Sequence, residues 1–281
     1  MAKALQSQTT TGMAELRPQF LEVGMPARRI ACLRREATRT GLPGLVWLGG
    51  FMSDMRATKA SFLDEYAAKT GRAFLRFDYS GHGESEGRFE DGTIGAWLAE
   101  SLAMIRVESQ GPQILVGSSM GGWLALLCAK ALAASGEAGR LAGLVLIAPA
   151  ADMTERLIWD QLTPELRQEI ETKGRCFLPS DYSDKPYPIT HALIEEGRKH
   201  LILDGTIRTH CPVHILQGMN DADVPWTHAT RIVEHLAGDP VVLTLVKDAE
   251  HRFSRPSDLA LLAQAVENIL EVPSQGKLKL D

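Results

Sequence analysis

A serine framed by glycines is the first feature of this sequence that could do chemistry. Gly117, Ser119 and Gly121 follow the apolar run QILV and precede the helical run WLALLCAKALAA. A sharp strand-to-helix turn of this kind exposes a serine hydroxyl, and side chains at the two glycine positions would collide with the neighbouring strand and helix. Ser118 lacks this frame and is predicted to be a buried hydroxyl. Ser119 is therefore the predicted nucleophile.

A serine hydroxyl needs a general base and a carboxylate that orients the base. Asp221 lies in the loop after the apolar run VHILQ, and His251 lies between the run VVLTLVKDAE and a new helical stretch. If these runs are parallel strands, both side chains lie at the same sheet edge as Ser119. We predict that His251 is the base and that Asp221 orients it.

Other interpretations of these residues stay open. Asp221 could be a turn or helix-capping residue, because aspartate is common before a helix start that contains proline. Asp223 is the neighbouring carboxylate that could replace Asp221. His82, between two glycines, is the alternative histidine.

Attack of serine on a carbonyl produces an oxyanion that two backbone N–H groups must stabilise. One is predicted to be the N–H of Met120, at the amino end of a helix. The other is predicted to be the N–H of Phe51, because Gly49 and Gly50 allow the backbone to approach a substrate. The alternative is that the two glycines form an ordinary turn. The loop after AFLRF contains Asp78 and Ser85, which are predicted to have structural roles.

The positions of these residues depend on alternating strands and helices. Short apolar runs predict strands near 44–50, 73–79, 113–118, 141–149, 213–218 and 241–246. Apolar residues three and four apart predict helices near 57–70, 92–108, 120–135, 225–237 and 256–271. Several strands are apolar throughout. The sequence therefore predicts an α/β fold, with a mostly parallel sheet covered by helices on both faces.

One segment interrupts the alternation. Residues 152–205 are charged and contain prolines, and we expect them to form an inserted cap of helices and loops. Residues 16–151 and 206–275 are expected to form the core, and residues 1–15 to be disordered. Apolar residues of the cap could line a substrate pocket or form a small core of their own: Trp159, Phe177, Leu178 and Tyr182.

Composition excludes several classes of protein. The 281 residues, 44% of them hydrophobic, suit one large domain, and the net charge of -5 gives no basic surface for nucleic acid. The cysteines have no disulfide or metal-ligand spacing, so we expect reduced thiols. The first 18 residues hold no apolar signal segment, and no other apolar run is long enough to span a bilayer. We therefore expect a cytoplasmic protein without a membrane span.

Longer stretches resemble a known family. RFDYSGHGESEG, GPQILVGSSMGGWL, QLTPEL, KGRCFLPSDYS, LQGMNDADVPW and DAEHRF run in this order through the chain. They resemble the α/β-hydrolase superfamily and, within it, the group of mycophenolic acid acyl-glucuronide esterases and palmitoyl-protein thioesterases. The chain departs from that group in lacking an evident mitochondrial presequence, which suggests a bacterial-type relative. It also departs from many hydrolases in having Gly49-Gly50 where they have His-Gly.

The resemblance implies hydrolysis of carboxylic esters or thioesters, with Ser119, Asp221 and His251 at the positions of the catalytic triad. The expected partner is a small acyl ester or thioester, or an acylated protein, and the reaction requires no metal or organic cofactor. The same scaffold could cleave amides or carbon–carbon bonds, or transfer an acyl group. A binding protein without catalysis is a third interpretation.

Overall fold

The computed structural model describes residues 17–25, 27–179 and 186–271 of the chain. The predictions for residues 1–15 and 272–275 and for Tyr182 therefore lie outside the described residues. The strands are β1 Gln19–Val23, β2 Arg28–Arg35, β3 Gly44–Leu48, β4 Phe74–Phe77, β5 Gln113–Ser118, β6 Leu141–Ile147, β7 Arg175–Leu178, β8 Tyr187–Thr190, β9 Val213–Gly218 and β10 Val241–Val246. The α-helices are α1 Thr58–Thr70, α2 Ile94–Glu108, α3 Met120–Ala134, α4 Pro164–Lys173, α5 His191–Gly197, α6 Trp226–His235 and α7 Pro256–Glu271.

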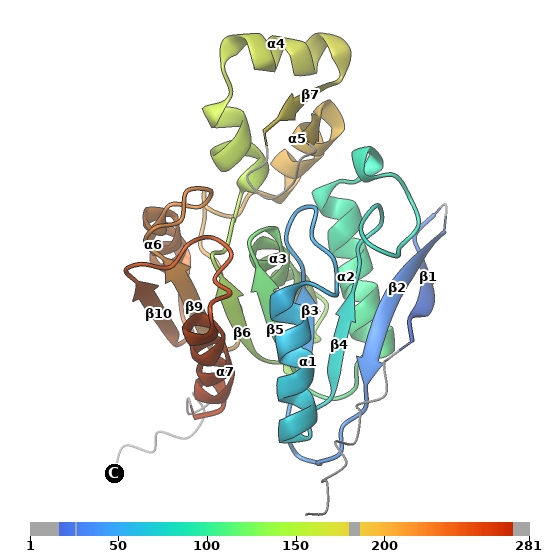
Figure 1. Cartoon of the computed structure of the whole chain (residues 1–281), viewed down its shortest axis with the longest axis vertical. Helices are drawn as coiled ribbons and strands as arrows, with labels where there is room; N and C mark the ends of the chain where they lie inside the picture. Colours follow the sequence, from blue (N-terminus) through green and yellow to red (C-terminus); the bar gives the residue numbers. More distant parts are fainter. Residues whose placement is uncertain (1–16, 26, 180–185, 272–281) are drawn as a thin grey trace, which may run out of the picture.

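Within the described residues, eight strands form one sheet in the order β1-β2-β4-β3-β5-β6-β9-β10 (Figure 1). The strands from β4 to β10 in this order run parallel, and β1 and β2 are antiparallel to their neighbours. The predicted α/β fold with a mostly parallel sheet is confirmed. Because the strands are parallel, the loops at their carboxyl ends meet along one edge.

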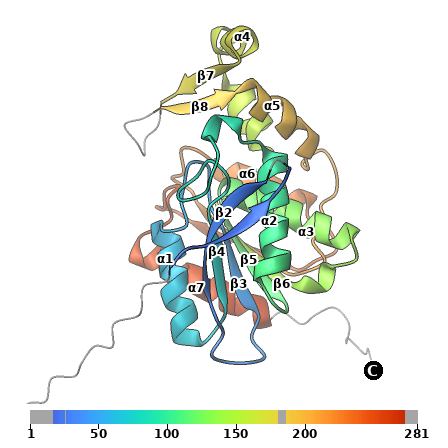
Figure 2. The same ribbon diagram turned by 90° about the vertical axis from the view of Figure 1, so that its right-hand side faces the viewer.

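Helices cover both faces of the sheet, as predicted. Figure 2 shows α1 and α7 on one side of the strands and α2 and α3 on the other. Successive side chains of a strand point to opposite faces. In β3, Leu45 and Trp47 join the core under α1 and α7, while Val46 and Leu48 join the core under α2 and α3. This burial on both faces explains why the strand is apolar throughout.

The antiparallel strands β1 and β2 were not among the predicted strands. β2 has the sequence RRIACLRR, in which charged residues flank a short buried centre, and the exposed side chains of β1 include Phe20. Neither sequence has the continuous apolar run that marks the buried strands. Pairing with β4, through Cys32 and Phe77 for example, holds β2 in the sheet.

The segment between β6 and β9 forms a separate layer above the sheet edge (Figure 1). It begins with a π-helix, Met153–Ile158, and continues through α4, the antiparallel pair β7 and β8, and α5. Its own apolar cluster includes Leu162, Ile170 and Cys176. The prediction of helices and loops here missed the β7–β8 pair, because each strand has only four residues and the two form a small sheet of their own.

One aspartate fastens both ends of this segment. The Asp152 side chain is fully buried, and its two carboxylate oxygens accept hydrogen bonds from the backbone N–H groups of Ile202 (2.8 Å) and Leu203 (3.0 Å). Arg156 also donates to the carboxylate at 3.1 Å. Asp152 has a left-handed backbone, with φ of 56°. The chain therefore leaves and re-enters the core at one point.

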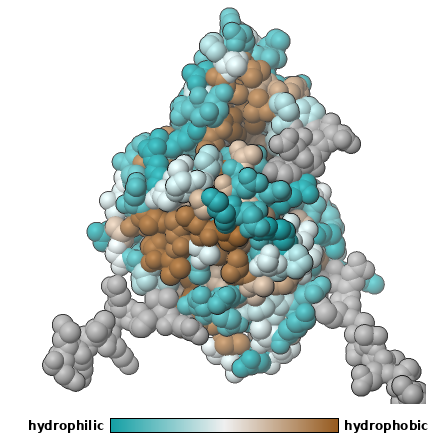
Figure 3. All heavy atoms as spheres, turned by 60° about the vertical axis from the view of Figure 1, so that its left-hand side comes forward, coloured by the Kyte–Doolittle hydropathy of each residue, from teal (hydrophilic) through white to brown (hydrophobic). Residues whose placement is uncertain are grey.

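The outer strand β10 leaves apolar side chains at the surface. Val242 and Leu245 are 45% and 38% exposed, and Figure 3 shows apolar (brown) atoms gathered on the side of the molecule that it brings forward.

All four cysteines are buried free thiols. Among the described helices, none combines the length and the apolar character needed to cross a bilayer.

Candidate active site

The turn between β5 and α3 holds Ser119 in a strained conformation. Its φ is 55° and its ψ is -119°, a backbone conformation that residues other than glycine rarely adopt. A Cβ atom at Gly117 would lie 2.3 Å from the Gly121 oxygen, and one at Gly121 would lie 2.0 Å from the Leu48 oxygen. The turn therefore requires both glycines for the steric reason expected from the sequence.

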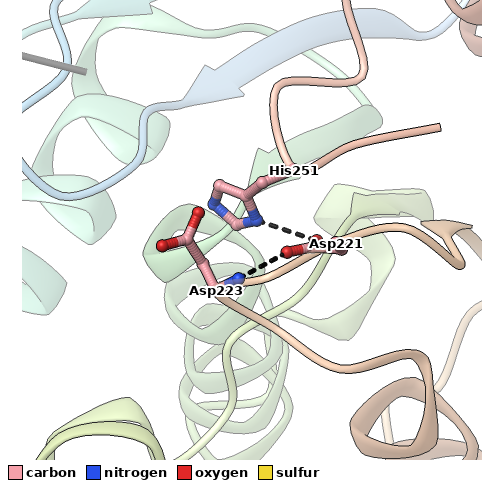
Figure 4. A group of neighbouring side chains, drawn as sticks. All are labelled: Asp221, Asp223 and His251. Carbon is pink, nitrogen blue, oxygen red and sulfur yellow. Dashed lines mark hydrogen bonds and ion pairs between the residues drawn. The ribbon is translucent and has the colours of Figure 1, made fainter. Parts of the chain in front are cut away.

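Asp221 and His251 come together from loops that follow β9 and β10. Figure 4 shows the two side chains in contact, with Nδ1 of His251 2.8 Å from Oδ2 of Asp221. The Asp221 side chain is fully buried, whereas that of His251 is 16% exposed. The histidine can therefore reach solvent and a substrate, while the carboxylate faces only protein.

The Asp221 carboxylate is saturated with hydrogen bonds. Oδ1 accepts from the backbone N–H groups of Asp223 (2.9 Å) and Val224 (2.8 Å). Oδ2 accepts from Nε2 of Gln217 (3.1 Å) as well as from His251. The rival carboxylate, Asp223, is an exposed residue whose backbone supports Asp221. Sequence reasoning missed Gln217, because it lies inside an apolar strand.

A metal ion is a second possibility for this group. Within the described ranges, the side chains close enough to share an ion are Asp221, Asp223 and His251, with ligand atoms within 4.8 Å of one another. Four hydrogen bonds already occupy the oxygens of Asp221. An ion would have to displace some of them, so the arrangement suits a carboxylate that orients an imidazole better than it suits a metal ligand.

Ser119 and His251 line the same cavity, which has a volume of about 510 Å³. Its walls come from residues after β3, β5, β6, β9 and β10 and from the segment above the sheet edge. This segment contributes apolar side chains: Met153, Leu157, Ile158, Leu178, Tyr187 and Ile189. The cavity therefore combines a polar floor, which holds Ser119 and His251, with an apolar roof.

The loop after β3 lies directly against Ser119. A Cβ atom at Gly50 would lie 3.5 Å from the Ser119 Cβ and 3.4 Å from the Ser118 oxygen. Phe51 lines the cavity, and its ring packs edge-on against Phe89 and Tyr187 with centroids 4.8 and 5.9 Å away. The backbone at Gly50 thus approaches Ser119 closely, as the prediction for Phe51 requires.

The other predicted donor, Met120, is the first residue of α3. Its side chain is fully buried. The backbone N–H groups in the first turn of a helix have no partner within the helix. The Met120 N–H is therefore available to bind an oxyanion beside Ser119, as predicted.

His82 is not among the residues that line the cavity, and it lies against the loop after β3. It is buried, and its Nε2 accepts a hydrogen bond from the Met52 N–H at 3.2 Å. Its Nδ1 lies 3.2 Å from the Ser80 oxygen, which fits the neutral form with the proton on Nδ1. Burial lowers the pKa of His82 to about 4. The alternative histidine is therefore placed to support the loop rather than to take a proton from Ser119.

The predicted pocket residues divide into two sets. Leu178 lines the cavity, but Trp159 and Phe177 are not among its lining residues. Phe177 is 49% exposed, because alternation along β7 turns its neighbour Cys176 inward instead. Trp159 packs on the cluster of Leu162 and Ile170. The prediction that Trp159 and Phe177 line the pocket is therefore corrected. Tyr182 lies outside the described residues.

Lys59 is a further cavity residue that sequence reasoning missed. It lies in the first turn of α1, and its Nζ donates a hydrogen bond to the backbone oxygen of Arg252, next to His251. Burial, assisted by the charge of Arg252, lowers the pKa of Lys59 to about 8. No local pattern distinguishes this lysine from one on an exposed helix, so only the tertiary structure shows its position.

Comparison with known proteins agrees with this architecture. The model of the alpha/beta hydrolase family matches residues 40–264. The chain belongs to this family and is a hydrolase.

Its similarity to individual proteins is high. It is 36% identical over 230 residues to the human mitochondrial palmitoyl-protein thioesterase ABHD10, which covers 82% of this chain and 73% of that protein. A putative hydrolase from Agrobacterium vitis S4 has a TM-score of 0.87 and 46% identity, covering 91% of this chain and 99% of that one. Mouse alpha/beta hydrolase domain-containing protein 10 has a TM-score of 0.79 and 33% identity, covering 91% and 98%.

These relatives correct the predicted location. The curated thioesterases from human, cattle and orangutan are mitochondrial by name, which contradicts the cytoplasmic location inferred above. That prediction depended on the lack of a recognisable targeting signal in the first 18 residues. Such a lack is weak evidence, because targeting segments are defined by composition rather than by a fixed motif.

Proposed function

We propose that this protein hydrolyses carboxylic esters or thioesters through an acyl-enzyme formed on Ser119. His251 is the general base, and Asp221 orients it. The observation that carries the proposal is the 2.8 Å contact between Asp221 and His251 at a cavity that also holds Ser119. The strained turn at Ser119 supports it, because strain of this kind is typical of nucleophilic serines.

In the first step Ser119 Oγ attacks the acyl carbonyl, and its proton passes to Nε2 of His251. Asp221 holds the proton of Nδ1, so Nε2 carries the lone pair that accepts this proton. The negative charge that develops on the carbonyl oxygen is stabilised by the N–H groups of Phe51 and Met120. The carboxylate of Asp221 also stabilises the imidazolium that forms.

In the second step the C–O or C–S bond breaks, and His251 returns the proton to the leaving alcohol or thiol. Water then attacks the acyl-enzyme, with its proton taken by Nε2 of His251. Collapse of the second oxyanion releases the carboxylic acid and returns the proton to Ser119. The cycle uses side-chain and backbone groups of this chain throughout.

We further propose that residues 152–205 act as a cap that binds the acyl group. The apolar side chains of Leu157, Ile158, Leu178 and Ile189 line the cavity from this side and suit a hydrocarbon chain. Polar groups such as Lys59 lie on the other side, where a leaving group would face solvent. The name of the human relative, a palmitoyl-protein thioesterase, supports an acylated substrate, either a small molecule or a protein.

The test is hydrolysis of p-nitrophenyl esters from acetate to palmitate, and of an acyl thioester, by wild-type protein and by Ser119→Ala. We expect turnover that is lost in the variant, with a chain-length profile that reports the size of the acyl pocket. Absence of turnover, combined with no labelling of Ser119 by a fluorophosphonate, would contradict the proposal. Labelling without turnover of these substrates would favour amide or carbon–carbon cleavage.

A further inference from the structure

Gln217, the fifth residue of β9, lies behind the Asp221–His251 pair and is completely buried. We propose that Gln217 is a positioning residue, which fixes the Asp221 carboxylate so that Oδ2 faces His251. This inference rests on the proposed function. It concerns a residue that acts through its hydrogen bond to Asp221.

The orientation of the Gln217 amide is determined by its surroundings. Three oxygens lie within hydrogen-bond distance of Nε2: those of Gly218 (3.0 Å) and Val224 (3.0 Å), and Oδ2 of Asp221 (3.1 Å). Turning the amide over would place Oε1 against these three acceptors. Repulsion excludes that orientation, so the nitrogen faces Asp221.

Gln217 completes the set of donors around Asp221. An ionised carboxylate accepts about four hydrogen bonds, two on each oxygen. On Oδ1 both come from backbone N–H groups, and on Oδ2 one comes from His251. Gln217 supplies the remaining one. Without it, Oδ2 would be held only by the histidine that it is meant to orient.

The amide also closes the loop that carries Asp221. Its two N–H protons are shared among Oδ2 of Asp221 and the oxygens of Gly218 and Val224, and so they join the start of the loop to its end. The other end of the amide is unfavourable for stability, because Oε1 is buried and has no hydrogen-bond partner within the described residues. An apolar side chain would avoid that cost, so the donor atom of Gln217 is the part that the site uses.

The experiment compares Gln217→Met with Gln113→Met in the full-length protein. Gln113 is a matched control: it is also buried in a strand, and its Nε2 donates to the backbone oxygens of Gln110 and Gly111. It lies at the opposite end of β5 from Ser119. Two readouts are used: kcat and KM on the best ester, and the low-field proton NMR signal of the Nδ1–H group of His251.

For Gln217→Met we expect kcat to fall roughly 10- to 100-fold with KM nearly unchanged, as for loss of a hydrogen bond to a charged group. The low-field signal should shift or broaden. Gln113→Met should leave kcat and the signal as in wild type. Equal effects in both variants, or an unchanged signal in Gln217→Met, would overturn the inference.

A second variant, Gln217→Glu, keeps the shape and makes the donor depend on pH. Titratable groups near its partner Asp221 include Asp223 and His251, and the charge of Lys59 also acts on Asp221. A protonated glutamic acid can donate to Asp221, whereas a charged one repels it. The activity of the variant relative to wild type should therefore rise as the pH falls, and a constant ratio would count against the inference.

These results separate the inference from the proposed function. If Ser119→Ala retained the activity, the proposed function would fail, and the NMR signal would still report whether Gln217 orients the pair. If Ser119→Ala abolished activity but Gln217→Met behaved like its control, only the inference would fail.

Discussion

The imidazole of His82 accepts a hydrogen bond from the backbone N–H of Met52, at 3.2 Å between Nε2 and N. The neighbouring contact between Met55 N and Oδ1 of Asp78 joins the same two loops. The loop after β4 therefore holds the loop after β3, which carries the proposed oxyanion donor Phe51. The structural role predicted for Asp78 agrees with this contact.

The neutral state of His82 predicts a pH-dependent stability. Burial lowers its pKa from 6.5 to about 4. Between these values the unfolded chain binds a proton that the folded protein does not, so stability falls as the pH falls through this window. Substituting His82→Gln removes the titration. The difference in unfolding free energy between wild type and variant should therefore shrink by about 3 kcal/mol between neutral pH and about pH 4.

Urea unfolding of both proteins at several pH values measures this difference. A difference that stays constant with pH would mean that His82 does not titrate differently in the folded state.

Asp221→Asn should lower kcat by about four orders of magnitude while the protein stays folded. An asparagine amide would donate to Nδ1 of His251 and stabilise the wrong tautomer, with a proton on Nε2. Asp223→Asn is the matched control, because it leaves the backbone N–H that supports Asp221 in place. Steady-state kinetics of the two variants checks the assignment, which would be reversed if Asp223→Asn were the more damaging change.

Gly121→Ala should destabilise the protein by about 1–3 kcal/mol or more, since the new Cβ meets backbone that cannot move aside. The new Cβ would lie 2.0 Å from the Leu48 oxygen. Gly139→Ala is the control, because its Cβ would have no neighbour within 4 Å. Thermal unfolding of the two variants distinguishes them, and similar melting temperatures would show that the turn can relax.

Asp152→Ala should cost about 3 kcal/mol, because it leaves the buried N–H groups of Ile202 and Leu203 without an acceptor. Asp204→Ala removes the other carboxylate partner of Arg156. Because the Asp204 side chain is 69% exposed, this change should cost less than about 0.5 kcal/mol. Limited proteolysis should cut the Asp152 variant within residues 152–205 first. Equal resistance of the two variants would contradict the fastening role.

The parallel part of the main sheet could be predicted closely from the sequence. The predicted strands and helices overlap β3 to β6, β9 and β10, and α1 to α3, α6 and α7, within a few residues. These elements are buried on one or two faces, so their apolar spacing reflects their environment. The strands β1, β2, β7 and β8 were missed because their partners, rather than their own composition, place them in sheets.

The site shows the same division. Ser119, Asp221 and His251 follow strand ends, so parallel topology alone brings them to one edge. The cavity lining depends on how the segment above the edge folds, which explains why Phe177 was predicted wrongly and Tyr187 was missed. Lys59 was missed because its partner, Arg252, is far away in the chain. Gln217 was missed because it lies inside an apolar strand.

Because the carboxylate of Asp152 binds the N–H groups of Ile202 and Leu203, the segment between β6 and β9 begins and ends at the same point of the core. A segment of another length or sequence could replace residues 153–201 without changing the path of β6 or β9, provided that Ile202 and Leu203 still present their N–H groups to Asp152. Substrate preference could thus change by exchange of this module, while the machinery at the sheet edge stays as it is.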